Sequence, residues 1–91
     1  MKVIVDFNMA IEGVFEPPIQ MELEGSRATV KDLLEHLSNL CPWIEFISGD
    51  ELGSDIQAVL VNEKEHFSLN TNLNEGDKVK IIIEIPAVAG G

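Results

Sequence analysis

The chain of 91 residues is long enough for one domain and too short for two, and its net charge at neutral pH is −10. Its composition, with 45% hydrophobic residues, is that of a globular protein. The six basic residues are scattered, which disfavours nucleic-acid binding and adsorption to anionic membranes, because both need clustered Lys and Arg. An acidic surface of this strength favours basic partners.

The sequence has few features that would indicate disulfide bonds, metal binding or targeting to a membrane. The single cysteine, Cys41, cannot form an intramolecular disulfide, and the sequence has no Cys/His cluster with zinc spacing. A charge at Asp6 interrupts the N-terminal apolar run before it reaches the length of a signal peptide. No stretch approaches the roughly 20 apolar residues that cross a bilayer. We therefore expect a soluble, cytoplasmic domain that binds no metal.

The first part of the chain predicts an antiparallel hairpin. Residues 2–8 alternate between apolar and polar side chains, which is the period of a strand. Residues 19–24 alternate in the same way and place their glutamates in water. Between these segments, residues 9–18 end in two prolines, which break regular structure and mark a connection. Neighbouring strands with a short connection commonly pair with each other.

The apolar spacing then changes to that of a helix. Thr29 is the expected N-cap, and Asp32 lies near the positive end of the helix dipole. Pro42 ends the helix, which predicts a helix over residues 29–40. The predicted apolar stripe consists of Val30, Leu33, Leu34, Leu37, Leu40 and Cys41.

The segment after the helix predicts a loop, then a strand and a turn. Residues 42–55 read as a loop with room for one short turn, and residues 56–61 are an apolar-rich run typical of a strand. Residues 62–64 supply a turn, and residues 65–69 predict a short edge strand. The expected apolar anchors of the loop are Trp43, Ile44, Phe46 and Ile47.

The last predicted strand, residues 78–85, follows a turn at residues 74–77 and ends at Pro86, which has no N–H for a ladder. The element order predicts an α+β roll, a mixed sheet of four to five strands with one main helix packed on one face. Ile82 and some apolar residues of 56–61 then lie on the uncovered face, which indicates a protein contact. Scattered exposed aliphatic side chains are the alternative interpretation.

Few side chains form a pattern that indicates catalysis, because no spacing joins a nucleophile to a base. His36 falls on the polar side of the predicted helix, and His66 falls beside a turn; we interpret both as surface histidines. Cys41 has no basic neighbour in the sequence, so we interpret it as a small core residue at the helix end.

One segment has part of a calcium-loop pattern. Asn70, Asn72 and Asn74 match its first, third and fifth ligand positions. The glycine, however, comes one residue late at Gly76, and Ile81 stands where the loop requires a bidentate Glu. We therefore reject calcium binding and interpret the asparagines as turn formers.

The most informative segment is the end of the sequence. After Pro86, five small residues, 87–91, end in Gly90-Gly91. Six extended residues from Pro86 reach about 20 Å. Two glycines without a Cβ can enter a narrow channel and leave the terminal carbonyl open to attack. We expect a domain at residues 1–86 and a flexible tail at residues 87–91.

In their order along the chain, four segments resemble the ubiquitin-like sulfur-carrier family that includes ThiS and MoaD, the small subunit of molybdopterin synthase. Each motif is degenerate, and the ordered set with a terminal Gly-Gly covers nearly the whole chain. The segments are the first helix with its preceding turn (27–41), a "V-x-V-N" strand end (59–63), an "L-x-x-G-D-x-V" turn (73–79) and the tail (86–91).

The resemblance implies a β-grasp, ubiquitin-like fold and a role as a carried co-substrate, not an enzyme. An E1-like enzyme of the MoeB/ThiF type would use ATP to adenylate Gly91, and a sulfur donor would then convert it to a thiocarboxylate. Gly90, Ala89 and Val88 would occupy the enzyme's channel, and the sheet face near the tail would be the docking surface. The acceptor would be an enzyme such as the large subunit of molybdopterin synthase. The carrier itself would bind no cofactor.

The departures from the family pattern concern the pathway. Many MoaD members carry Pro-Pro before the last residues, whereas the second position here is Ala87. The length favours the MoaD-like group and hence molybdopterin biosynthesis, with thiamine or cysteine biosynthesis as variants. The acidic composition also fits archaeal ubiquitin-like modifiers, so conjugation of Gly91 to lysines is the alternative function. A binding module with an incidental Gly-Gly end is the third.

Overall fold

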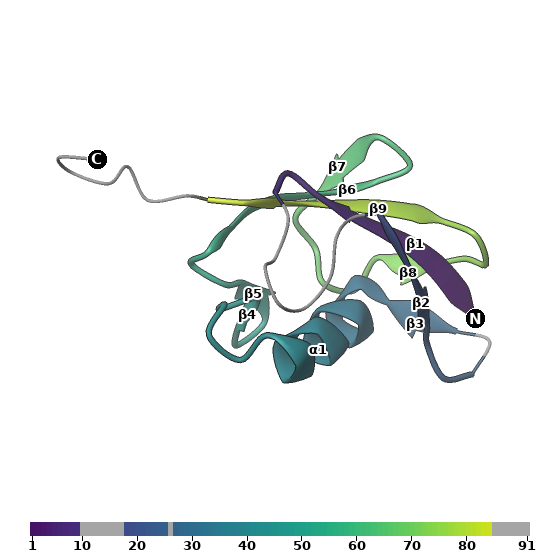
Figure 1. Ribbon diagram of the computed structural model, residues 1–91, viewed down its shortest axis with the longest axis horizontal. Coiled ribbons are helices and arrows are strands. Elements are labelled where there is room, and N and C mark those ends of the chain that lie inside the picture. Colours follow the sequence, from purple (N-terminus) through teal and green to yellow (C-terminus); the bar gives the residue numbers. More distant parts are fainter. Residues whose placement is uncertain (10–17, 26, 85–91) are drawn as a thin grey trace, which may run out of the picture.

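A five-stranded mixed sheet with one helix across it forms the body of the protein (Figure 1). The structure is a computed structural model, and it describes residues 1–9, 18–25 and 27–84. The predicted connection at residues 9–18 and the predicted tail thus lie largely outside the described residues. In spatial order, the strands of the sheet are β2 (Ile19–Glu22), β1 (Lys2–Phe7), β9 (Lys78–Ile83), β6 (Ile56–Val61) and β7 (Lys64–His66).

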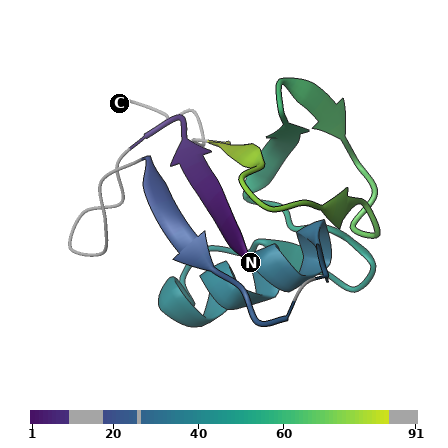
Figure 2. The ribbon, with the colours of Figure 1, turned by 90° about the vertical axis from the view of Figure 1, so that its right-hand side faces the viewer.

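The first and last strands of the described chain are neighbours in the middle of the sheet (Figure 2). β1 pairs antiparallel with β2 and parallel with β9, so the predicted hairpin is confirmed. β6 continues the sheet antiparallel to β9, and β7 is its other edge. The expected edge strand at residues 65–69 therefore exists, one residue earlier and shorter than predicted.

The helix α1 (Val30–Leu40) confirms the predicted element and begins with a capping box. The Thr29 hydroxyl accepts from the Asp32 N–H at 3.3 Å, and the Thr29 N–H donates to the Asp32 carboxylate at 2.8 Å. Leu40 was expected in the apolar stripe and is 44% exposed, so that prediction is wrong. Leu40 lies at the edge of the apolar stripe and is the last residue of the helix, so no further helical turn covers it.

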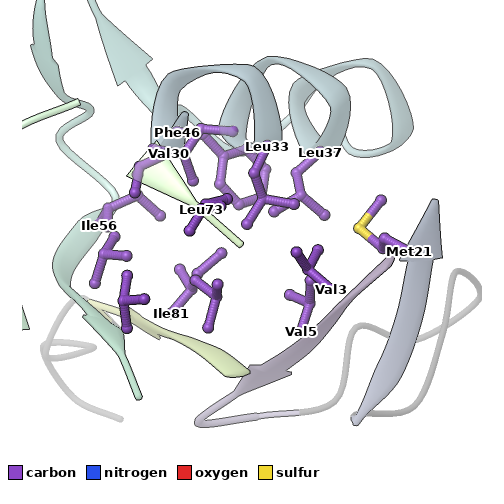
Figure 3. Packing of buried hydrophobic residues seen from close by; sticks show 14 of the residues in the cluster. Val3, Val5, Met21, Val30, Leu33, Leu37, Phe46, Ile56, Leu73 and Ile81 are labelled. Carbon is purple, nitrogen blue, oxygen red and sulfur yellow. The ribbon is translucent and has the colours of Figure 1, made fainter. Parts of the chain in front are cut away.

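The core lies between α1 and one face of the sheet (Figure 3). Leu33 and Leu37 point down from the helix, and Val3, Val5 and Ile81 point up from the two central strands; all are fully buried. Because alternate strand residues face the helix, one face of each central strand is apolar and packed. Cys41 is also fully buried, as predicted.

Short elements that the sequence did not predict complete the fold. β3 (Ala28–Thr29) pairs with β8 (Asn72–Leu73), and β4 (Ile47–Ser48) forms a small hairpin with β5 (Glu51–Leu52) within the predicted loop. Two-residue strands are too short for a periodic pattern to reveal them.

The predicted anchors of that loop divide into two groups. Phe46 is fully buried, as expected, and Ile44 and Ile47 pack against the core, whereas Trp43 is 63% exposed. The expectation for Trp43 is therefore wrong. The Ile44 N–H donates to the Cys41 carbonyl at 3.1 Å, which closes a turn around Pro42 and leaves Trp43 on its outer side.

Candidate functional site

The residues expected to react or to enter an enzyme's channel lie outside the described residues, which end at Glu84. This applies to Gly91, Gly90, Ala89 and Val88. The structure instead defines the point from which they continue. We call Ile83 and Glu84 the tail base. β9 reaches it at the end of the sheet farthest from the N-terminus (Figure 1).

One flank of the tail base is held by a side chain from the end of β1. The Asn8 amide nitrogen donates to the Ile83 carbonyl at 2.9 Å, and the Asn8 amide oxygen accepts from the Ile83 N–H at 2.9 Å. The last Cα pair between the two strands is Phe7 with Ile81. The Asn8 side chain thus extends the pairing of β1 with β9 beyond the end of the regular ladder.

The other flank of the tail base is held by the residue before β6. The Glu84 N–H donates to the Asp55 carbonyl at 2.8 Å. Asp55 is in turn fixed, because its carboxylate accepts from the Glu45 N–H at 2.7 Å. Gly53 lies so close to the Glu45 carbonyl that a Cβ there would clash with backbone, so this arrangement requires glycine.

A β-bulge lies beside the tail base. Ile56 pairs with Ile83 and Ala58 pairs with Ile82, so Gln57 is one extra residue on β6. The bulge explains the apolar run that the sequence showed in this strand. Ile56 and Val59 face the core, whereas Ala58 faces the opposite side of the sheet.

The face of the sheet opposite α1, here called the open face, combines aliphatic side chains with lysines. Ile4, Leu60 and Ile82 are half-buried on it, as the sequence predicted for Ile82. A groove of about 310 Å³ crosses it. The residues that line this groove are Ile4, Asp6, Pro18, Leu60, Glu63, Lys78, Val79 and Lys80.

The open face carries lysines as well as carboxylates. Strand alternation places Lys2, Lys78 and Lys80 there, which is half of the six basic residues of a chain with a net charge of −10. Among the described residues, neither Lys78 nor Lys80 forms an ion pair. Carboxylates lie on both sides of the sheet: Asp6 and Glu63 line the groove on the open face, and Glu65 is the cross-strand partner of Leu60. A second groove, beside the helix, is lined by Glu22, Glu24, Asp32 and Glu35.

The "V-x-V-N" segment (59–63) and the "L-x-x-G-D-x-V" turn (73–79) contact each other, and these contacts stabilise the fold. The Asn62 amide donates to the Asp77 carboxylate at 2.9 Å, and its oxygen accepts from the Lys78 N–H at 3.0 Å. The same carboxylate accepts from the Asn74 N–H at 2.7 Å. The turn after β6 is thus joined to the turn before β9, and this fixes the start of the strand that leads to the tail base.

The remaining candidate side chains form no catalytic arrangement in the described part of the chain. His36 is exposed, and His66 lies 3.5 Å from the Thr71 hydroxyl. Burial raises the pKa of the Cys41 thiol, which makes it less reactive. The structure gathers no three His, Cys, Asp or Glu side chains at a metal-binding distance within residues 1–9, 18–25 and 27–84. In the same ranges, no helix is long and apolar enough to span a membrane.

The fold places the protein in the β-grasp, ubiquitin-like class. It matches the solution structure of the HVO 2177 protein of Haloferax volcanii with a TM-score of 0.73 and 23% identity, over 96% of this chain and 86% of that one. SAMP1 from the same organism matches with a TM-score of 0.72 and 21% identity, over 96% and 99% of the two chains. A putative molybdopterin converting factor subunit 1 from Pyrococcus furiosus gives 0.70 and 23%, over 92% and 98%.

The sequence narrows that class to a family. The ThiS family matches residues 14–91, which is most of the chain and includes the segment after the tail base, and the protein belongs to this family. No curated protein matches the chain in a search by sequence. The resemblance to the family and the expected β-grasp fold are therefore confirmed.

Sequence reasoning singled out the terminal glycines, which lie outside the described residues, and it did not predict the residues that hold the tail base. Asn8 and Ile83 are 75 positions apart. The sequence signal for Asn8 is weak, a polar residue directly after an alternating strand, and many such residues bond nothing. Asp55 acts through its backbone carbonyl, which carries no sequence signal at all.

Proposed function

We propose that the protein is a sulfur carrier whose terminal Gly91 is adenylated by an E1-like enzyme and converted to a thiocarboxylate. Membership of the ThiS family over residues 14–91 supports this proposal most directly. Proteins of this family work with E1-like enzymes and acceptor enzymes, and they are generally not catalysts themselves.

The chemistry follows from the weak reactivity of a carboxylate. The Gly91 carboxylate attacks the α-phosphorus of ATP and releases pyrophosphate, so that AMP becomes the leaving group on the acyl carbon. The terminal sulfur of a persulfide then displaces AMP, and a thiol cleaves the resulting S–S bond to release the thiocarboxylate. In this scheme ATP and the activating groups belong to the enzyme, and this chain contributes the carboxylate and the surface that docks.

The open face suits the docking of an enzyme. It offers half-buried aliphatic side chains at Ile4, Leu60 and Ile82, and its groove is lined by Lys78 and Lys80 as well as by Asp6 and Glu63. We assign to it an enzyme surface with an apolar centre and acidic groups at its rim, because such a surface would match both features. The tail base is the end of β9, so an enzyme docked on the open face lies on the same sheet from which the chain continues toward Gly91.

Molybdopterin biosynthesis is the pathway that we propose, with the large subunit of molybdopterin synthase as acceptor. The similarity to the putative molybdopterin converting factor subunit 1 and the chain length support it. Thiamine and cysteine biosynthesis remain variants of the same chemistry. Conjugation of Gly91 to lysines is a second candidate function. The similarity to the small archaeal modifier protein 1 of Haloferax volcanii supports it.

Intact-mass spectrometry tests the carrier function. The protein is incubated with an E1-like enzyme, ATP and a persulfide donor, and a carrier should gain a species in which one oxygen is replaced by sulfur. Omission of ATP is the control, because the unactivated carboxylate should not react. If only unmodified protein survives with an enzyme from the same genome, the carrier proposal fails.

Immunoblotting of the tagged protein in cell extract separates the second function from the first. A modifier gives a ladder of heavier bands that resists reducing agent, because an isopeptide bond is not cleaved by thiols. A carrier gives a thiocarboxylate without such conjugates.

A further inference from the structure

We propose that Asn8 is a positioning residue for the activation of Gly91. Its side chain fixes the direction in which the chain leaves the sheet. The inference rests on the proposed carrier function, because it concerns how the reacting carboxylate is presented.

The geometry of the contact carries the proposal. A primary amide holds a donor and an acceptor side by side in one plane, and a backbone residue offers the complementary pair. Asn8 makes both bonds to the same residue, Ile83, each at 2.9 Å. A pair of bonds defines an orientation as well as a position, and this pair adds to the pairing of Ile83 with Ile56 on the other side of the strand.

The Asn8 contact is needed because β1 itself stops short of the tail base. The last Cα pair of the β1–β9 ladder is Phe7 with Ile81, two residues before Ile83. On the other flank, the β-bulge at Gln57 interrupts the pairing with β6, and Glu84 bonds to the Asp55 carbonyl. Without the Asn8 side chain, the tail base would be held from that flank alone.

Orientation at the tail base matters because the reacting atom is distant from it. The seven residues 85–91 reach about 25 Å when extended in an enzyme channel. For a tail that the channel holds straight, a rotation of about 10° at the base would move the far end by about 4 Å, which exceeds the separation of about 3 Å at which reacting atoms must meet. The Asn8 bonds to Ile83 therefore affect the fraction of docked complexes in which Gly91 is correctly placed for reaction. They do not act on docking itself, because Asn8 is not among the residues that line the groove on the open face.

Steady-state kinetics of ATP–pyrophosphate exchange tests this assignment with the E1-like enzyme that activates the wild-type chain. Asn8→Ala removes both bonds to Ile83. We expect kcat to fall by about tenfold, while KM for the carrier stays within about twofold of wild type. Asn39→Ala is the matched control, because Asn39 is exposed on α1 and has no side-chain hydrogen bond to any described residue. This control should leave both constants unchanged.

A second variant and a structural measurement distinguish a positioning effect from a loss of folding. Asn8→Asp is isosteric and keeps the acceptor, but it places a carboxylate oxygen against the Ile83 carbonyl. We expect it to lower kcat as Asn8→Ala does. In Asn8→Ala the Ile83 amide should exchange with solvent faster than in wild type, because its N–H loses the Asn8 acceptor. The exchange of core amides such as that of Val5 should not change in either variant.

Each outcome decides between the proposals. If the wild-type chain is adenylated and folded Asn8 variants keep the wild-type kcat, the positioning role is wrong and the carrier function stands. A raised KM with unchanged kcat also overturns it, because Asn8 would then act in docking. If no E1-like enzyme of the same genome activates the wild-type chain, the proposed function fails. The positioning role of Asn8, which rests on that function, then fails as well.

Discussion

Glu63 occupies the second position of a tight turn in which two consecutive non-glycine residues have positive φ angles, 50° at Asn62 and 73° at Glu63. A turn of this kind between antiparallel strands favours Asn-Gly, because a Cβ is strained in the left-handed region. Asn62 tolerates the conformation and uses its side chain to bind Asp77. Glu63 has no such compensation from a hydrogen bond within the described residues.

Glu63→Gly should therefore stabilise the protein by about 0.5–1 kcal/mol, because relief of the strain exceeds the added entropy of glycine in the unfolded chain. Urea unfolding of the two proteins measures the difference in free energy. Glu63→Ala is the control; it retains a Cβ and should give no gain. A Glu63→Gly variant no more stable than wild type would mean that the turn carries no strain.

The Cys41 thiol gives a pH dependence with a definite sign. Burial raises its pKa above the ordinary value of 9.0, so the folded state holds this proton more tightly than the unfolded state does. The resulting stability is fully present below pH 9 and is lost as the pH rises through the folded-state pKa. As the pH rises above about 9, the unfolding free energy should fall more steeply in wild type than in Cys41→Ala. Parallel slopes in the two proteins would contradict this.

Single residues show where sequence-based prediction stops. The terminal glycines were visible because their lack of a Cβ is a local property. The pairs Asn8–Ile83 and Asn62–Asp77 were not, because they join residues that only the finished sheet brings together. Motif resemblance pointed to Asn62 and Asp77, and the structure supplies the physical reason for them.

The helix was predicted within one residue because its signals are local: an N-cap, a 3.6-residue apolar period and a proline that ends it. The same local signals overestimated burial at Leu40 and Trp43. Periodicity says which side of an element faces inward, but not whether the core extends as far as its last residue. The β3–β8 ladder and the β4–β5 hairpin depend on tertiary contacts, and no periodic pattern marks them.

Two leucines of the same helix stripe should therefore respond differently to truncation. Leu37→Ala should cost about 2–5 kcal/mol because it opens a cavity under the helix, where Leu37 is fully buried. Leu40→Ala changes a 44% exposed side chain and should cost less than about 1 kcal/mol. Thermal or urea unfolding of the two variants makes the comparison. Equal losses would show that the helix end is packed in solution.

The open face carries exposed lysines, although the protein as a whole is acidic. In a chain with a net charge of −10, the groove on this face is lined by Lys78 and Lys80 together with Asp6 and Glu63. Lys80→Glu should raise KM for the activating enzyme about threefold to tenfold, with kcat nearly unchanged, because a charge at the rim acts mainly on association. The effect should shrink as salt is added.

Lys31→Glu is the matched control for that experiment. It makes the same change in net charge but lies on α1, on the far side of the sheet, where its ammonium is 3.9 Å from Asp50. It should alter KM much less. If both variants raise KM equally, net charge rather than the open face governs association.

The sharpest separation between folding and function is expected at the end of the chain. The proposed chemistry takes place on the carboxylate of Gly91, so one added residue should abolish adenylation. The described residues form a hydrophobic core, and an added residue after Gly91 replaces none of them, so stability should change by no more than about 0.5 kcal/mol. Gly90→Val should likewise spare folding, while its branched side chain obstructs a channel built for glycine. Thermal melting and ATP–pyrophosphate exchange measure the two properties side by side. A chain that carries the added residue, melts normally and is adenylated at the wild-type rate would exclude Gly91 as the reacting residue.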